Sequence, residues 1–323
     1  MRFLRGAVVC ALVLGASACR RDNGVHAFLD ESYPDKLSDW RLFGTQGANL
    51  VANEGVFAYE VRTPLFANYA MKKRTLWMPP GKKARARTNG SIEFPVGTIF
   101  TKTFSYPAAA GERRIETRLL VRRASGWVAL PYVWNREQTE ATLAPTGDMT
   151  SVTYRDGHGA EHQITYSVPN VNQCRRCHDQ GGDTVPIGPK VRNLDAATLQ
   201  RIGLAEPSRS ADSLDVRARA YLDANCAHCH NPSGSAMAIP LNYRLEQNDP
   251  DRLGLRFAAT KPVPNAPGLA NIIEPGDPDR SLLVVRMEST EPKIGMPTLG
   301  HDVVDREGIE LIRQWIRAMK PRA

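Results

Sequence analysis

Apolar and polar residues alternate along much of the chain between residues 40 and 168, which is the period of strands with one buried face. Short turn signals separate the runs, for example ASG at 124–126 and DG at 156–157. The runs that read as strands are Phe94–Tyr106, Glu116–Val121, Trp127–Trp134, Ser151–Arg155 and His162–Val168. We therefore predict a β-rich domain over residues 40–168, built as a sandwich or small barrel.

Helical periodicity is clear in two later segments. Apolar residues recur at helical spacing in the segment that leads into Cys226, namely Leu214, Ala218, Tyr221 and Leu222. A second segment begins after Asp305, ends before Pro321 and places Ile309, Ile312, Ile316 and Met319 on one face. The run SVPNVNQ at 167–173 instead reads as extended chain. The expected fold class is α+β, with the β-rich domain followed by a mostly α-helical region.

The N-terminus has the pattern of an export signal. Arg2 and Arg5 precede a short apolar run, Ala7–Gly15, and Ala16-Ser17-Ala18 follows it. A run of this length is too short to remain in a bilayer as a spanning helix. We therefore expect residues 1–18 to be a signal peptide that is removed, which places the mature protein outside the cytoplasm.

The residues around Cys19 indicate a lipid anchor. The stretch LGASAC resembles a bacterial lipobox, in which Cys19 carries lipid and becomes the first mature residue, although Ala16 stands where Leu is usual. The alternative is simple cleavage after an A-x-A site, which would leave an exposed N-terminal thiol. Arg20 in place of Asp implies sorting to the outer membrane. Residues 19–39 would then be a tether on the periplasmic side.

Charge and cysteine content argue against a nucleic-acid partner and against a structural disulfide. The formal charge of +8 comes from scattered Arg and Lys without a long basic run, which argues against a nucleic-acid partner. Of the six cysteines, Cys10 leaves with the signal and Cys19 is assigned to the lipid. The other four form two C-x-x-C pairs, so no cysteine is left over for a structural disulfide.

Each pair is followed directly by histidine. Cys174-Arg-Arg-Cys177-His178 and Cys226-Ala-His-Cys229-His230 both match C-x-x-C-H, the attachment signature of c-type haem. Two cysteines three residues apart can reach the two vinyl groups of one porphyrin, and the adjacent His can bind the iron. We therefore predict two covalently attached haem c groups, with Cys174, Cys177, Cys226 and Cys229 as attachment sites and His178 and His230 as iron ligands.

Two other uses of paired cysteines fit less well. A zinc ribbon has its two pairs about 15–20 residues apart. Here residues 178–225 separate Cys177 from Cys226, and the same His follows both pairs. A redox C-x-x-C would be expected inside a βαβ unit, which neither pair has.

The region around the second motif resembles class I cytochrome c, because a helix, C-x-x-C-H, Met-Pro and a second helix follow one another in that order. The resemblance implies that Met296 is the axial ligand opposite His230. Met287, inside the apolar run LLVVRM, is better explained as core. The resemblance also implies that the carbonyl of Pro240 orients His230. His228, inside the motif, is expected to point to solvent.

The first motif lacks an obvious sixth iron ligand, because neither Met nor His occurs between Asp179 and Cys226. Ile187-Gly188-Pro189 resembles the segment that supports a proximal His. The sixth position could hold water, stay open, or be filled from elsewhere in the chain. The residues that remain candidates are Met71, Met78, Met149, His158, His162 and Met237.

From about residue 37 to the C-terminus the chain resembles a family of bacterial diheme c-type cytochromes. The matching stretches include TPLFANYAMKKRTLWMPPG, FPVGTIFTKTF, LPYVWN, VPNVNQCRRCH, RARAYLDANCAHCHNP and RMESTEPKIGMP. The expected domains are the β-rich domain (40–168), a first haem segment (169–212) and a cytochrome c-like domain with the second haem (213–323).

Extracytoplasmic electron transfer is the function that these features favour, with an unknown protein as redox partner. No pair of carboxylates in the β-rich domain has a spacing that argues for acid–base catalysis. The alternative is a peroxidase-like haem oxidoreductase that uses an open first haem. A third possibility is a subunit of a larger complex, in which the β-rich domain is the interaction module.

Overall fold

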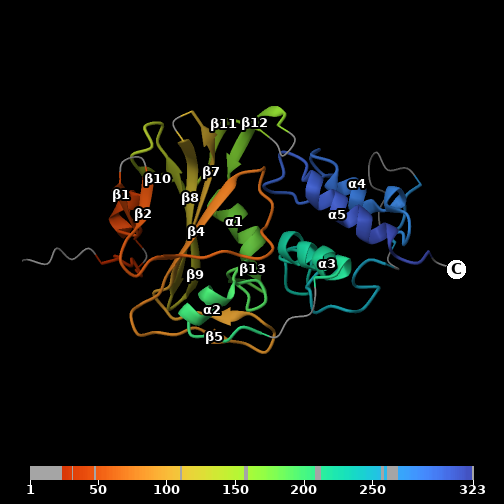
Figure 1. Ribbon diagram of the computed structural model, residues 1–323, viewed down its shortest axis with the longest axis horizontal. Helices are drawn as coiled ribbons and strands as arrows, with labels where there is room; N and C mark the ends of the chain where they lie inside the picture. The colour runs from red at the N-terminus through yellow and green to blue at the C-terminus, as the bar shows by residue number, and fades with distance from the viewer. Residues whose placement is uncertain are drawn as a thin grey trace, which may run out of the picture.

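The structure is a computed structural model that describes residues 24–30, 32–46, 49–109, 111–155, 159–207, 212–255, 258–259 and 268–321. The expected signal peptide, the expected lipid site Cys19 and the candidate ligand His158 lie outside these residues. Figure 1 shows the β-rich part on one side of the molecule and the helices α3, α4 and α5 on the other.

A six-stranded antiparallel sheet forms the framework of the β-rich part, with the strand order β10-β9-β8-β7-β4-β3. Branched and aromatic residues, which suit a pleated surface, fill its central strands. The strands are β3 (Phe57–Ala58), β4 (Met71–Trp77), β7 (Ile99–Ala108), β8 (Gly111–Arg123), β9 (Gly126–Trp134) and β10 (Ala141–Leu143). The strands expected at Glu116–Val121 and Trp127–Trp134 are therefore confirmed as parts of β8 and β9.

Four two-stranded ladders accompany the sheet: β1 (Phe43–Gln46) with β2 (Asn49–Ala52), β5 (Arg85–Ala86) with β6 (Ile92–Glu93), β11 (Asp148–Arg155) with β12 (Glu161–Val168), and β13 (Asp179–Gln180) with β14 (Asp183–Thr184). The β11–β12 hairpin alternates as its sequence predicts. Its inward residues Val152, Tyr154, Tyr166 and Val168 pack with Phe104 and Tyr106 of β7.

The segment before residue 40 packs on the sheet. A 3₁₀ turn at Leu37–Trp40 buries both of its end residues in the core that β7, β8 and β9 form. The indole nitrogen of Trp40 donates a hydrogen bond to the hydroxyl of Tyr132 on β9 at 2.8 Å. The described part of the expected tether is therefore docked rather than free.

The expectation of a mostly α-helical second part is wrong. The α-helices there have only 6 to 12 residues each: α1 (Val171–His178), α2 (Ala196–Arg201), α3 (Leu214–Asn225), α4 (Leu282–Met287) and α5 (Arg306–Arg317), with a 3₁₀ turn at Pro278–Arg280. The sequence from 231 to 280 contains eight prolines, and proline removes a helical hydrogen bond and clashes with the preceding turn. The described parts of that stretch run through turns instead.

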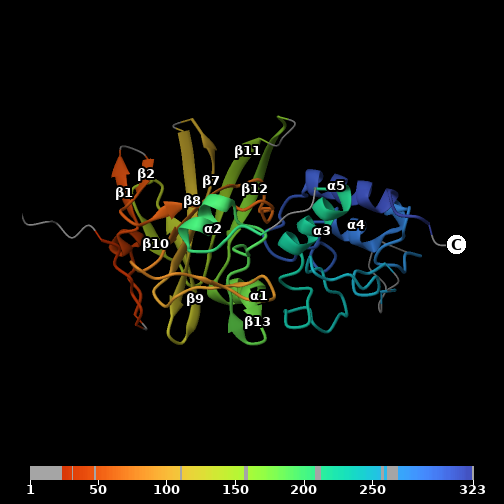
Figure 2. The same ribbon diagram turned by 60° about the horizontal axis from the view of Figure 1, so that its bottom comes forward.

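The two segments with clear helical periodicity do form helices, and they pack against each other. Helix α5 begins at its cap Asp305, whose carboxylate accepts from the Gly308 amide at 2.9 Å. Its apolar face packs with Ala218 and Leu222 of α3 in one buried cluster. Figures 1 and 2 place α1 between the sheet and α3, so the first motif lies where the two halves of the molecule meet.

Candidate functional site

Helix α1 carries the whole first motif. Asn170 caps it: its side chain accepts from the Gln173 amide at 2.8 Å, and the Gln173 side chain accepts from the Asn170 amide at 2.9 Å. This reciprocal cap satisfies two of the free amides at a helix start. The expectation of extended chain through residue 173 is therefore wrong, and the N-x-x-Q spacing at 170–173 was the signal for the helix.

His178 is held as a neutral imidazole with one nitrogen available. Its Nδ1 lies 2.7 Å from the carbonyl oxygen of Val185, an arrangement in which Nδ1 donates and Nε2 is left to bind a metal. Burial lowers the pKa of His178 to about 4, so the ring is uncharged at neutral pH. The supporting carbonyl belongs to Val185, two residues before the Ile187–Pro189 segment that the sequence suggested.

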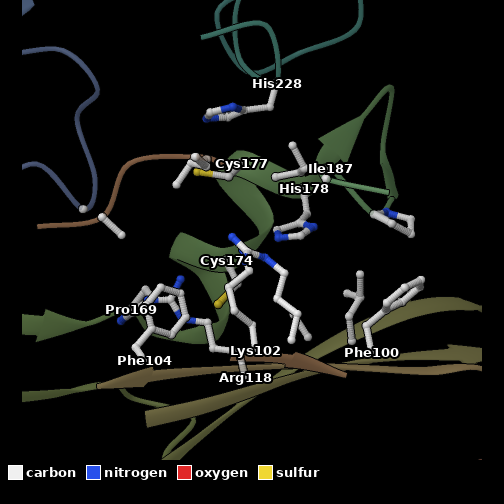
Figure 3. Close-up of a pocket in the computed structure, with 18 of the residues that line it drawn as sticks. Phe100, Lys102, Phe104, Arg118, Pro169, Cys174, Cys177, His178, Ile187 and His228 are labelled. Atoms are coloured by element: carbon white, nitrogen blue, oxygen red, sulfur yellow. The ribbon is translucent and has the colours of Figure 1, made fainter. Parts of the chain in front are cut away.

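The side chains of the first motif line one cavity between α1 and the sheet (Figure 3). Cys174, Cys177 and His178 come from α1, while Phe100 and Phe104 come from β7. Pro169, Ile187 and Pro189 add further apolar wall. An apolar, largely enclosed space with a Cys, Cys, His donor set on one side is the environment that a porphyrin needs.

Cationic side chains form the sheet side of this cavity. Arg118 of β8 makes a two-point ion pair with Glu116, which is 0% exposed and also accepts from the hydroxyl of Tyr166 at 2.6 Å. Lys102 of β7 is the ladder partner of Arg118. Burial, with repulsion from Arg74 and Arg118, lowers the pKa of Lys102 to about 7. Sequence reasoning missed both cations, because only the folded sheet brings them to the motif.

The candidate sixth ligands named from the sequence do not reach this cavity. Met149 and Met237 are each 68% exposed, and Met71 is exposed as well. Met78 packs against the apolar cluster that contains Phe100 without lining the cavity, and the ring of His162 stacks on Tyr154 of the β11–β12 hairpin. None of these five residues lines the cavity, and His158 lies outside the described part of the chain.

The second motif follows directly from α3, whose C-terminal cap is Cys226. The ring of His230 lies edge-on to that of Tyr243 at 5.7 Å. Nδ1 of His230 and the hydroxyl of Tyr243 are buried, and neither has a hydrogen-bond partner in the described chain. The expectation that the Pro240 carbonyl accepts from His230 is therefore not met.

Met296 lies in the loop that follows α4. Its amide donates to the carbonyl of Arg286 at 2.9 Å, and Arg286 is close enough to His230 to lower the pKa of that ring, with burial as the larger cause. Met287 is buried in the α3–α5 core, as expected for a packing residue. The same loop leads to His301, which is buried and interacts with the backbone of Met287 and Ser289. Sequence reasoning gave His301 no role.

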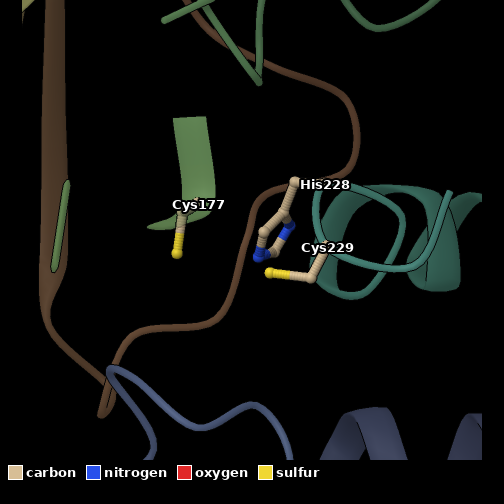
Figure 4. Close-up of side chains that lie close together, drawn as sticks. All are labelled: Cys177, His228 and Cys229. Atoms are coloured by element: carbon tan, nitrogen blue, oxygen red, sulfur yellow. The ribbon is translucent and has the colours of Figure 1, made fainter. Parts of the chain in front are cut away.

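The two motifs are adjacent. The sulfur atoms of Cys177 and Cys229 and a ring nitrogen of His228 all lie within 4.8 Å of one another (Figure 4). A hydrogen bond from the Cys177 thiol lowers the pKa of Cys229. His228 is buried and lines the cavity of the first motif, so the expectation that it points to solvent is wrong. Its neighbour in space, Cys177, is 51 positions away in sequence, which no local pattern reveals.

An ion-pair cluster fixes this adjacency. Asp223 of α3 is 6% exposed and accepts from Nζ of Lys190 at 2.9 Å and from the guanidinium of Arg192 at 2.7 Å. Burial would raise the pKa of Asp223, but the two cations outweigh it and lower that pKa. The Gln180 side chain also donates to the His228 carbonyl at 2.9 Å. These bonds tie the segment that follows the first motif to α3 and to the second motif directly after it.

Within the described residues, no helix combines the length and apolar character needed to cross a membrane. No protein-family model, curated protein or solved structure matches this chain.

Proposed function

We propose that this protein is a diheme c-type cytochrome that transfers electrons outside the cytoplasm. The observation that carries the proposal is the adjacency of two C-x-x-C-H motifs, with the sulfurs of Cys177 and Cys229 within 4.8 Å. A thioether at each sulfur would bring the edges of two porphyrins into contact. Electrons could then pass between the two haems directly, without an intervening carrier.

The residues present fit two haem groups. Cys174 and Cys177 would hold the first and Cys226 and Cys229 the second, with His178 and His230 as iron ligands. Haem iron, when bound, supplies reversible one-electron chemistry. Val185 fixes the tautomer of His178, which leaves Nε2 as its binding atom. Phe100 and Phe104 would pack against the porphyrin of the first site from the sheet.

Haem stoichiometry tests the proposal. The mature protein, exported from a host that attaches haem to such motifs, should contain two ferrohaemochromes per chain in alkaline pyridine. The paired variants Cys174→Ser/Cys177→Ser and Cys226→Ser/Cys229→Ser should each contain one, because each pair holds its own haem. Denaturing mass spectrometry should give the same counts, since thioethers survive unfolding. A wild-type chain with no bound haem would overturn the proposal.

A metal centre is the second candidate, because Cys177, His228 and Cys229 could themselves hold a thiophilic ion. The two candidates exclude each other, since a thioether sulfur cannot act as a thiolate ligand. In the metal case, four thiols would react with a thiol reagent after denaturation in chelator, and His228→Ala would lower the metal content. In the haem case, no thiol of these four would react and the haem count would be unaffected.

We also propose that the chain is a lipoprotein held at the periplasmic face of the outer membrane through Cys19. Wild-type protein should incorporate labelled fatty acid and partition with membranes. Cys19→Ala should lose the label, because it removes the only sulfur that the lipobox-like stretch offers. Arg20→Ala should keep the label and serves as the matched control. Wild-type protein that is released as a soluble chain starting at Cys19 would instead support simple signal cleavage.

A further inference from the structure

The amine of Lys102 stands out among the polar groups that line the cavity of the first motif. Its strand, β7, also places Phe100 and Phe104 on the cavity wall, because residues two apart on a strand share a face. Its Nζ lies 5.6 Å from the centroid of the Phe104 ring. No carboxylate or carbonyl among the described residues bonds the Lys102 side chain, so its amine has no hydrogen-bonding role there.

The other cations at this wall are already paired. Arg118 has both guanidinium bonds to Glu116, and Arg74 contacts Glu60 at 3.4 Å and the carbonyl of Lys72 at 3.4 Å. Guanidinium groups also stay protonated in proteins and so have no lone pair for a metal. A lysine amine, once its proton passes to water, does have one.

Four further lining residues carry possible ligand atoms, namely Tyr59, Tyr166, Asp223 and His228. The hydroxyl of Tyr166 donates to Glu116 at 2.6 Å and burial raises its pKa, while the carboxylate of Asp223 is held by Lys190 and Arg192. Tyr59 would have to bind as a phenolate, and burial raises its pKa, which disfavours that form. His228 lies with the sulfurs of Cys177 and Cys229, at the edge where the porphyrin would attach and not over its centre. Lys102 instead rises from the sheet, while His178 comes from α1 on the other side of the cavity (Figure 3).

From this arrangement we propose that Nζ of Lys102 is the sixth ligand of the first haem, opposite His178. The inference rests on the proposed function, since it needs a haem at Cys174 and Cys177. It assigns the first haem His/Lys ligation, a closed site that leaves no coordination position for peroxide. The two haems would then differ in ligation, and the first would serve as an electron carrier like the second.

Electron paramagnetic resonance of the oxidised protein tests the ligand, after the pyridine assay has shown two haems in each variant. Wild-type protein should give only low-spin ferric signals. Lys102→Ala and Lys102→Arg should each convert one of the two haems to the high-spin form, because neither side chain can bind iron and water takes the position. Lys102→Met should restore a low-spin signal with changed g values, since a thioether can replace the amine.

Matched variants of the competing ligands complete the design. The variants Tyr59→Phe, His228→Ala and Lys72→Ala should all keep the wild-type signals. Lys72→Ala is the control for loss of a neighbouring amine, because Nζ of Lys72 donates a hydrogen bond to the Leu65 carbonyl at 2.6 Å. High-spin iron in the wild type, unchanged signals in Lys102→Ala, or conversion by His228→Ala would overturn the assignment of Lys102. With two haems still present, each of these results would leave the proposed function standing.

Discussion

Replacement of Asp223 by alanine is expected to lower the free energy of unfolding by about 3–5 kcal/mol, the usual cost of removing one partner of a buried ion pair. Asp223 is 6% exposed, and its carboxylate satisfies Lys190, Arg192 and the amide of Leu245. Alanine would leave the partly buried Lys190 without a counter-charge and Arg192 with only the exposed Glu246. Equilibrium unfolding of the haem-loaded protein in denaturant would measure the loss, followed by absorbance and by circular dichroism.

Glu246→Ala is the matched control, because Glu246 pairs with the same Arg192 from the surface and is 51% exposed on its side chain. An exposed pair contributes about 0–1 kcal/mol, so this variant should unfold close to the wild type. The double variant Asp223→Leu/Lys190→Met should recover part of the loss, since apolar groups of similar volume can replace a buried pair. Equal stability of Asp223→Ala and Glu246→Ala would show that the cluster does not hold the halves together.

The carboxylate of Asp223 also makes the free energy of unfolding depend on pH. The cations lower the folded pKa of Asp223 below its usual range, so the unfolded chain takes up the proton first as the pH falls. The ionised Asp223 therefore makes its full contribution to the free energy of unfolding above the pKa that Asp223 has in the unfolded chain. That contribution is lost as the pH falls through the lower pKa of Asp223 in the folded protein. In Asp223→Ala this part of the acid sensitivity should be absent.

Patterns within short stretches of sequence predicted several of the strands and helices. Alternation located β11 and β12, apolar runs of strand length located β8 and β9, and helical spacing located α3 and α5. The expected helical second part failed for a physical reason. That expectation applied the helix order of a cytochrome c domain to residues 231–280. This stretch contains eight prolines, and each proline lacks the backbone amide that a helical hydrogen bond needs.

The candidate site likewise contains residues that the sequence alone identifies and residues that only the fold brings together. The Cys, Cys, His spacing is a property of neighbouring residues, so the sequence alone identifies it. Lys102, Val185 and His228 reach the first motif only through the sheet, a loop and the packing of α3 against the first haem segment. A residue that reaches the motif across such a distance carries no local pattern, so the sequence offered only methionines and histidines as candidates for the sixth ligand.

Substitution of Met296 by alanine is expected to have the largest effect on the redox properties. If its thioether binds the second iron opposite His230, Met296→Ala should abolish the red charge-transfer band of ferric His/Met haem. It should also lower the potential of that haem by on the order of 0.1 V or more, within the roughly 0.8 V that axial ligands span, because a thioether favours ferrous iron. Optical spectra and a potentiometric titration would measure both changes.

Two matched variants separate ligation from packing. Met287→Leu keeps the volume of a buried methionine in the α3–α5 core and should leave band and potential unchanged. His301→Ala removes the buried imidazole that lies five residues after Met296. Should His301→Ala change the spectrum while Met296→Ala does not, the sixth ligand would be His301 and the second haem would be a bis-histidine centre. Loss of the band in Met296→Ala alone would instead show that the second haem has His/Met ligation and a high potential. The first haem would then differ in ligation, and electrons would run from the first haem to the second.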